Sequence, residues 1–446
     1  MSEAPRRRRV LWASVFTGCA LLGGVLAFWW RTPRDLQELS NDQLVDLALA
    51  KGWPPARDDV AGNAVGILLS RPAPERWATA VRLAGDASPL RRALGAGLFT
   101  GERRDFRGGK RDELAAHLEP MLDDADARVR RQALGSFANL CFHDIDRAVP
   151  ERAFAVAREL FAASDPKDRG TAVAAAAELG RRVAPLRDAL VELVRREPDG
   201  GLRFLATSAL LCVRPVDAGL QEVRRRMLDD SDPNVRWTAA SWFEVVPEGG
   251  ADAIPRLLAM AQDGNEDRNA RRGAVSALAR LPTDREQAAL VFALLLAMAP
   301  NLEEIAKDTW CRDVGRIAAA VAGSPSLVTA GALLRDIARD ESHRVSAVAA
   351  LARVAAAQSE VAFRPDDVEA LRAAVRKWHE SVRESSEYMP FEAGADDAVE
   401  ALLLLSGSPE RGVRTDEIRP VLETVAKSDA QWLRDWAREL LQRLAR

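Results

Sequence analysis

The sequence predicts an all-α protein, a right-handed α-solenoid in which stacked helix pairs bury one continuous core. Two observations lead to this prediction. Apolar residues recur at the three- and four-residue spacing of a helix face. An aspartate followed four residues later by an arginine also returns at a nearly constant step along the chain. The chain has 446 residues and is long enough for such an array.

The chain begins with a basic segment and continues with an apolar one. Arg6–Arg9 precede an uncharged run, Val10–Trp30, and a helix rising about 1.5 Å per residue would carry that run across a bilayer's hydrocarbon core. We therefore expect residues 10–30 to be a transmembrane signal anchor, between a basic tail (1–9) and a linker (31–40). More arginines precede the run than follow it, so the positive-inside rule places the tail in the cytoplasm. The repeats would then lie on the extracytoplasmic side of a bacterial inner membrane.

Two alternatives remain open for this run. Phe16-Thr17-Gly18-Cys19 resembles the box at which bacterial lipoproteins are cut and lipidated, and a cleaved secretory signal also joins basic to apolar residues. Both fit less well than an anchor, because a cut before Cys19 would leave a long apolar stretch on the mature chain. The run also ends in Ala27-Phe28-Trp29-Trp30, which is typical of an aromatic belt at a membrane interface.

Two segments show the repeat unit most clearly. Met121-LDDADARVRRQALGSFANL and Met227-LDDSDPNVRWTAASWFEVV each combine the end of one helix, a short acidic turn and a second helix. Aspartate is a good N-cap because its carboxylate accepts from free amides of the first turn, and Pro233 suits the first helical position. The frame recurs in five consecutive copies: Asp126/Arg130, Asp165/Arg169, Asp199/Arg203, Asp232/Arg236 and Asp267/Arg271.

Apolar stripes behind these frames give the expected core. The stripe residues are Ala172, Ala175, Ala176 and Leu179, then Val235, Ala239, Trp242, Phe243 and Val246, then Ala270, Ala274, Ala277, Leu278 and Leu281. Trp237 and Trp436 lie one helical step off a stripe, and we expect them to be partly buried against the next repeat.

Looser copies extend the array in both directions. Leu90, Leu94, Gly97 and Leu98 fit the frame with Arg91 in the arginine position, and Leu433, Ala437, Leu440, Leu441 and Leu444 fit it with Arg434. Segments 285–324 and 325–361 keep the paired-helix pattern. We expect roughly ten helix pairs over residues 41–446, with irregular insertions near 101–112 and 380–396.

The cysteines are expected to be free thiols. Cys141 and Cys212 fall near the ends of second helices two repeats apart, on the order of 20 Å, whereas a disulfide needs Cα atoms within about 7 Å. Cys311 lies in another helical pattern, and the chain has no C-x-x-C pair. All three are expected to act as small buried hydrophobic residues.

The pattern D-x-x-V-R, with alanines and leucines behind it, resembles HEAT repeats of the kind found in phycobilisome lyases. The resemblance covers most of residues 85–446. It implies an armadillo-like helical solenoid in which the turn aspartate and the helix arginine of the five frames bridge neighbouring repeats. Asp168 departs from the pattern, since a charge occupies the apolar position before Arg169.

Catalytic motifs are missing from the sequence. It has no G-x-S-x-G, H-E-x-x-H or dinucleotide glycine fingerprint. The four histidines, His117, His143, His343 and His379, are scattered, and a metal site needs three or four convergent ligands. We therefore expect no catalytic residue, no metal and no cofactor.

Two irregular segments are candidate partner contacts. The first carries Arg103, Arg104, Arg107, Lys110 and Arg111, which could grip carboxylates or phosphates. The second carries Tyr388 and Phe391 in acidic surroundings and could be a docking loop. A solvated insertion and a long connecting loop, respectively, are the plainer interpretations.

These features favour a membrane-anchored, non-enzymatic scaffold that binds partner proteins through its repeat surface. The partners are not identified by the sequence. A structural spacer or self-assembling solenoid is one alternative, and a HEAT-like lyase or lyase partner is another. Residues 35–446 carry a net charge of about −8, which disfavours nucleic acid because phosphate backbones are bound mainly by Lys and Arg. No small-molecule substrate is expected.

Overall fold

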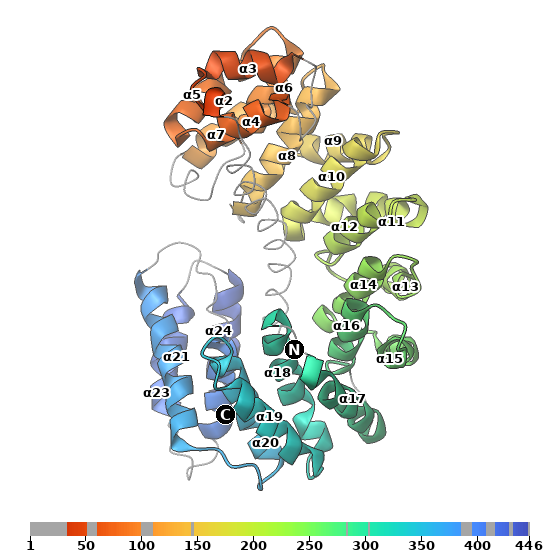
Figure 1. Ribbon diagram of the computed structural model, residues 1–446, viewed down its shortest axis with the longest axis vertical. Coiled ribbons are helices and arrows are strands. Elements are labelled where there is room, and N and C mark those ends of the chain that lie inside the picture. The colour runs from red at the N-terminus through yellow and green to blue at the C-terminus, as the bar shows by residue number, and fades with distance from the viewer. Residues whose placement is uncertain are drawn as a thin grey trace. The chain divides into compact units, whose positions relative to one another are not determined.

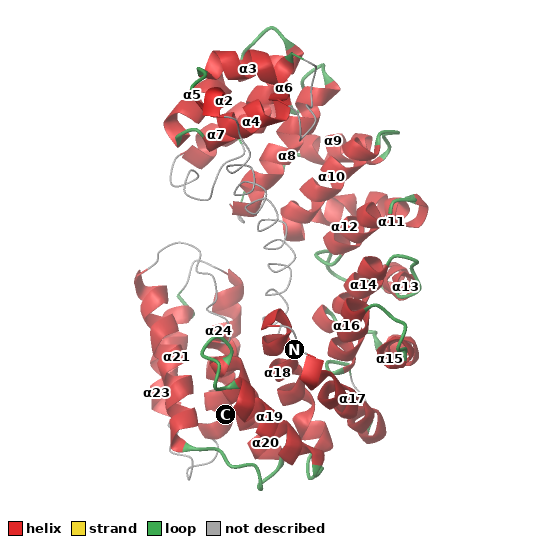
Figure 2. Ribbon diagram, viewed as in Figure 1, coloured by secondary structure: helices red, strands yellow, loops and turns green. Residues whose placement is uncertain are grey.

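The computed structural model describes residues 34–50, 60–99, 110–143, 147–281, 284–301, 304–384, 395–406, 415–427 and 431–444. All regular structure in these ranges is helical (Figures 1 and 2). The expected anchor, residues 10–30, lies outside them. Among the helices that the structure does describe, none has both the length and the apolar character needed to cross a bilayer.

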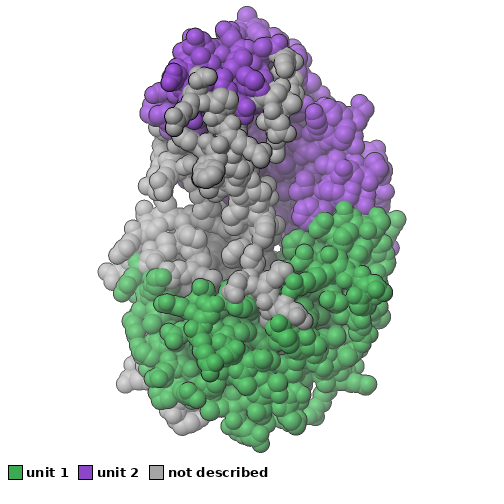
Figure 3. All heavy atoms as spheres, in the orientation of Figure 1, with its two compact units in different colours: residues 1–8, 224–446 green, residues 9–223 purple. Residues whose placement is uncertain are grey.

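Backbone contacts divide the chain into two compact units (Figure 3). Unit 2 comprises residues 9–223, and unit 1 comprises residues 224–446 together with 1–8. The sequence predicts one uninterrupted array, whereas the contacts place a boundary between Val223 and Arg224, inside a helix. Each unit is described by itself below.

Unit 2 is a succession of short helices. Its helices are α2 (Arg34–Gln37), α3 (Asn41–Leu49), α4 (Val60–Ser70), α5 (Ala73–Ala84), α6 (Pro89–Leu98), α7 (Lys110–Met121), α8 (Ala127–His143), α9 (Glu151–Phe161), α10 (Pro166–Leu179), the 3₁₀ helix η3 (Gly180–Leu186), α11 (Arg187–Arg196) and α12 (Gly200–Leu210). Helix α13 (Ala218–Met227) crosses the boundary.

Unit 1 continues the alternation with somewhat longer helices. It contains α14 (Pro233–Val245), η4 (Ala251–Ala253), α15 (Ile254–Gln262), α16 (Arg268–Leu278), α17 (Arg285–Met298), η5 (Ala299–Asn301), α18 (Glu304–Ile317), η6 (Ala318–Val321), α19 (Ser326–Ile337), α20 (Arg344–Ala357), α21 (Pro365–Glu384), α22 (Ala395–Ser406), α23 (Thr415–Val425) and α24 (Gln431–Leu444). Helix α21 extends to Glu384, into the segment 380–396 where the sequence predicts an irregular insertion.

The second helix of each pair packs against the second helix of the next pair. In unit 2 this row consists of α6, α8, α10 and α12, and in unit 1 it consists of α14, α16, α18, α20 and α22 (Figure 1). The first helices pack against the other side of their partners. This stacking closes the apolar stripe that one helix pair leaves open.

N-caps begin most of the second helices as expected. The carboxylates of Asp165, Asp199, Asp232 and Asp267 accept hydrogen bonds from first-turn amides at 2.8–2.9 Å. Asp126 does the same at the start of α8. Each aspartate thus satisfies an amide that the helix cannot pair internally.

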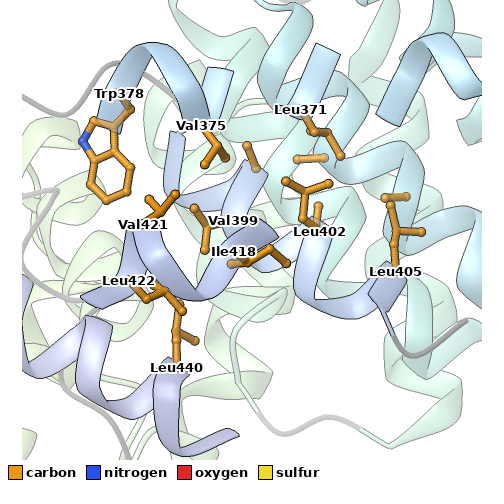
Figure 4. Packing of buried hydrophobic residues seen from close by; sticks show 14 of the residues in the cluster. Leu371, Val375, Trp378, Val399, Leu402, Leu405, Ile418, Val421, Leu422 and Leu440 are labelled. Atoms are coloured by element: carbon orange, nitrogen blue, oxygen red, sulfur yellow. The ribbon is translucent and has the colours of Figure 1, made fainter. Parts of the chain in front are cut away.

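The expected core residues are buried. Val235, Ala239, Trp242, Phe243 and Val246 are at most 4% exposed, and the stripes of α10 and α16 are also buried. Near the C-terminus, α21, α22, α23 and α24 enclose a further core (Figure 4). Its labelled members are Leu371, Val375, Trp378, Val399, Leu402, Leu405, Ile418, Val421, Leu422 and Leu440.

Of the two tryptophans expected to be partly buried, Trp436 lies deeper than expected, whereas Trp237 is partly buried against the next repeat as expected. Trp436 is only 4% exposed, and its ring meets Trp378 edge to face, with centroids 5.9 Å apart. Trp237 lies beside Gly273, where an added Cβ would come within 2.8 Å of its ring. Aromatic rings here fill the space between neighbouring helices.

The cysteines of the described ranges are buried thiols, as expected. Cys141, Cys212 and Cys311 take part in no disulfide. Burial raises the pKa of Cys212 to about 11 and the pKa of Cys311 further, so both remain protonated at neutral pH.

Gly95 gives a test of the close packing between α5 and α6. A Cβ there would come within 2.8 Å of the backbone nitrogen of Ala84, so Gly95→Ala should lower the free energy of unfolding by about 1–3 kcal/mol through overpacking. Gly135 of α8 has open space around it, so Gly135→Ala should raise stability by up to about 1 kcal/mol. Urea unfolding followed by circular dichroism measures both, and equal effects would contradict this packing.

Candidate functional site

An arginine near the start of several second helices links one repeat to the next. The Nη1 of Arg92, Arg130, Arg169 and Arg236 donates to two consecutive carbonyls of the preceding turn. The remaining guanidinium nitrogens reach an acid of the following repeat. These pairs are Arg92–Asp124, Arg130–Glu159, Arg169–Glu197 and Arg236–Glu266.

Most of these arginine–carboxylate contacts are bidentate. Arg169 donates to both oxygens of Glu197, at 2.6 and 3.0 Å, and only 1% of the Glu197 side chain is exposed. The hydrogen bond from Arg169 lowers the pKa of Glu197, while burial opposes it. Arg92 forks Asp124 in the same way, at 2.7 and 3.0 Å. Such paired charge-assisted bonds are among the strongest polar contacts in proteins.

The bridging partner differs from the one that the HEAT resemblance implies. Asp126, Asp165, Asp199, Asp232 and Asp267 cap their own helices, because their carboxylates already serve first-turn amides. The bridging acid is another residue, either just before the next cap (Asp124, Glu197 and Glu266) or within the next first helix (Glu159). The backbone N–H of Asp199 also donates to Glu197, so cap and bridge share one turn.

Two arginines depart from the expected positions. Arg92, not Arg91, occupies the bridging position of α6, four residues after Ser88, while Arg91 pairs with Asp46 of α3 at 2.6 Å. Arg271 forms no bridge to any residue that the structure describes. The described residues of the turn before α18 end at Asn301, three residues before Glu304 begins the helix. Arg203 donates to the carbonyls of Glu197 and Pro198.

Asp168, which breaks the sequence pattern, is an ion-pair partner. It accepts from Arg131, a residue of α8 that is only 8% exposed. The charge therefore links α8 to α10 on the neighbouring repeat and does not disturb the stripe behind it.

The candidate partner contacts lie largely beyond what the structure describes. This holds for Arg103, Arg104, Arg107, Tyr388, Phe391 and the side chain of Lys110; Arg111 lies in α7. Of the histidines, His117 stacks on Phe99, His343 pairs with Asp308 at 3.0 Å, and His379 hydrogen-bonds Thr424. Within the described ranges, no group of three or more His, Cys, Asp or Glu residues could hold a metal ion.

The most concentrated polar chemistry lies on the second helices of unit 1. We call this set the charged row; it consists of Glu244, Arg280, Arg312, Asp313, Arg316, Arg353, Asp397 and Glu400. These residues come from α14, α18, α20 and α22 and from the turn that follows α16. Asp313, Asp397 and Glu244 are almost fully buried.

One end of the charged row is closely paired. Arg312 Nε donates to Asp397 at 3.1 Å, and Arg353 lies 2.9 Å from Glu400 and 3.8 Å from Asp397. Burial would lower the pKa of Arg312, but the charge and hydrogen bond of Asp397 outweigh it and raise that pKa. At this end of the charged row, the two guanidinium groups of Arg312 and Arg353 face the two carboxylates of Asp397 and Glu400.

The other end of the charged row contains Asp313, Glu244, Arg316 and Arg280. Asp313 accepts from Ser276 at 2.6 Å and from Arg316 at 3.0 Å, and Glu244 lies 3.8 Å from Arg316. Burial and then the nearby Arg280 lower the pKa of Arg316. Burial likewise lowers the pKa of Arg280, whose Nε donates to the carbonyl of Glu244 at 3.2 Å. A cavity of about 10 Å³ beside Ser276 and Asp313 holds at most about one water.

Sequence reasoning missed the charged row. Arg312 and Arg316 are four residues apart, so one helix turn brings both to the same face, and that spacing was a usable signal. Their partners Asp397 and Glu244 lie far away in sequence, and only the stacking of helices reveals them.

Comparisons with known proteins agree with this architecture. No protein-family model matches the sequence, and no curated protein matches it. Among solved structures, importin beta aligns over 91% of this chain and 63% of its own, with a TM-score of 0.53 and 13% identity. An engineered protein (TM-score 0.46, 16% identity, 83% of this chain and 99% of its own) and YibA from Escherichia coli (0.34, 15%, 72% and 94%) are also similar.

The likeness to importin beta shows the fold alone. Together with the stacked helix pairs and their capped second helices, it defines an all-helical solenoid of the HEAT-repeat type. The sequence resemblance to HEAT repeats is therefore confirmed at the level of the fold.

The inter-repeat bridge can be tested at Arg236. Arg236→Gln should lower the free energy of unfolding by about 2 kcal/mol, because Glu266, with a side chain 6% exposed, loses its cation. Arg271→Gln makes the same charge change in the next repeat, where no bridge is found among described residues, and should shift stability by less than about 0.5 kcal/mol. Denaturant titration compares them; equal losses would show that the bridge is not the cause.

Glu178 of α10 gives a pH test. No hydrogen bond or ion pair joins it to a described residue, and burial raises its pKa to about 7. Because the pKa of Glu178 is higher in the folded than in the unfolded protein, binding of a proton to this carboxylate favours folding. This contribution to stability is complete below the unfolded-state pKa and is lost as pH rises through 7. Glu178→Gln should therefore be more stable than the wild type at pH 8, on the order of 1 kcal/mol. The gap should close towards pH 4.5; a gap independent of pH would contradict this assignment.

Proposed function

We propose that this chain is a non-catalytic protein-interaction scaffold held at a membrane by residues 10–30. The HEAT-type fold is the observation that supports this function, since stacked repeats create extended surfaces for binding.

The membrane part of the proposal rests on the sequence. Val10–Trp30 is an uncharged run of bilayer length that ends in two tryptophans and follows four arginines. With the tail in the cytoplasm, the helical repeats face the extracytoplasmic side and meet partners there.

Crosslinking in the native membrane, followed by identification of attached proteins, tests the scaffold. We expect the full-length chain to capture the same protein or proteins reproducibly, because a scaffold has defined partners. A chain with the same tail and anchor but an unrelated folded domain is the control. Capture of nothing beyond that control would contradict the proposal.

Extraction and protease protection test the anchor and its direction. The full-length chain should resist alkaline carbonate, whereas a chain lacking residues 10–30 should be released. Protease added to spheroplasts should digest the repeats if they lie outside the cytoplasm. Digestion only after the inner membrane is broken would reverse the orientation.

A further inference from the structure

One junction between second helices of unit 1 is packed much less closely than its neighbours. Helices α14 and α16 approach each other along their length, and so do α18 and α20, whereas α16 and α18 come close at far fewer positions. Helix α17 also approaches its partner α18 less than α15 approaches α16 or α19 approaches α20. The junction between α16 and α18 therefore separates two closely packed blocks, α14–α16 and α18–α22.

Glycines mark the close packing inside each block. A Cβ on Gly273 of α16 would come within 2.8 Å of the ring of Trp237 on α14. A Cβ on Gly315 of α18 would come within 3.1 Å of the backbone of Ala350 on α20. Helices this close have little freedom to move against each other, because packed protein interiors are nearly incompressible. Each block is therefore rigid in itself.

The space between α16 and α18 is incompletely filled. A cavity of about 10 Å³ lies there, and its lining includes Ser276 of α16, Leu295 of α17 and Asp313 of α18. Side chains around a void lose the contacts that a filled space would give them, which weakens the packing. Arg271 also forms no ion pair with a described residue at this step, unlike Arg236 one repeat earlier.

Polar contacts nevertheless cross this junction. The Oγ of Ser276 donates to Asp313 at 2.6 Å, and both residues are almost fully buried. A hydroxyl that donates to a carboxylate at this distance makes a charge-assisted hydrogen bond. Arg316 of α18 lies 3.0 Å from Asp313 and 3.8 Å from Glu244 of α14. The bond between Ser276 and Asp313 is thus the shorter of these contacts between the two blocks.

We propose that the junction between α16 and α18 is a hinge within unit 1, held closed by the Ser276–Asp313 hydrogen bond. Bending here disturbs few close helix contacts, whereas bending between α14 and α16 or between α18 and α20 would drive atoms into a neighbouring backbone. When the hinge opens, the angle between the two blocks changes while each block keeps its internal packing. The hinge belongs to the fold of unit 1 and is independent of the proposed scaffold function.

Distances between spin labels on the full-length protein in detergent test the hinge. The hinge pair of labels replaces Ala259 of α15 and Thr329 of α19, two exposed residues on either side of the junction. The control pair replaces Ala78 of α5 and Ala155 of α9, which are also exposed and also lie two repeats apart, within unit 2. Labels attached through a ketone-bearing amino acid leave the native cysteines unlabelled.

Double electron–electron resonance gives the distribution of distances for each pair. We expect the distribution of the hinge pair to be about twice as wide as that of the control pair, because only the hinge pair spans a loosely packed junction. Equal widths in the wild type would overturn the hinge.

Ser276→Ala removes the hydrogen bond that holds the hinge, and Ser136→Ala is its matched control. Ser136 of α8 is buried too and donates at 2.6 Å to the carbonyl of Ala96 on α6, but α6 and α8 are closely packed. Ser276→Ala should raise the share of hinge-pair distances outside the main peak about fivefold, whereas Ser136→Ala should change the control pair by less than about twofold.

A third variant separates the hydroxyl from other effects of substitution. Ser276→Thr keeps the hydroxyl and should keep the wild-type distribution of the hinge pair. Circular dichroism of each variant shows whether the helices are retained. An unchanged hinge-pair distribution in Ser276→Ala, equal broadening in Ser276→Thr, or equal broadening of the control pair by Ser136→Ala would each show that this hydrogen bond does not hold the hinge.

Discussion

An arginine four residues after the N-cap links the second helices α6, α8, α10 and α14 to the following repeat. The guanidinium of Arg169 donates to two carbonyls of its own turn and forks Glu197 of the next repeat. One side chain thereby fixes the shape of a turn and the distance to the neighbouring turn. The carboxylate of Glu197 can be nearly fully buried only because a cation meets it. The alanine-rich stripes then pack closely behind a spacing that is already set.

The pattern of polar contacts between repeats changes within unit 1. Within the described ranges, Arg271 forms no bridge of the kind that Arg236 makes to Glu266. Charges reappear farther along the second helices, where Arg312 reaches Asp397 and Arg316 reaches Asp313. Burying such groups is costly unless they are paired, and in this row Asp397 and Asp313 each meet a guanidinium of α18.

Much of the local structure follows from the sequence alone. Asp232 and Pro233 predict the start of α14, and the helical spacing of Val235, Ala239 and Phe243 predicts which face of the helix is buried. The repeats that match the frame only loosely do not show which arginine forms the bridge. Arg91 and Arg92 are adjacent and chemically equal, and only the position of Asp124 in the next turn decides which of them bridges.

What the sequence by itself determined is the helical repeat, its caps and its core, because these depend on residues within one turn or one helix of each other. It also determined an apolar run long enough to span a bilayer. The tertiary structure decided which acid each arginine meets, how deeply Trp436 is buried, and that Arg312 and Asp397 belong to one network. The reason is physical: those contacts join separate helices, and their geometry exists only after the stripes have stacked.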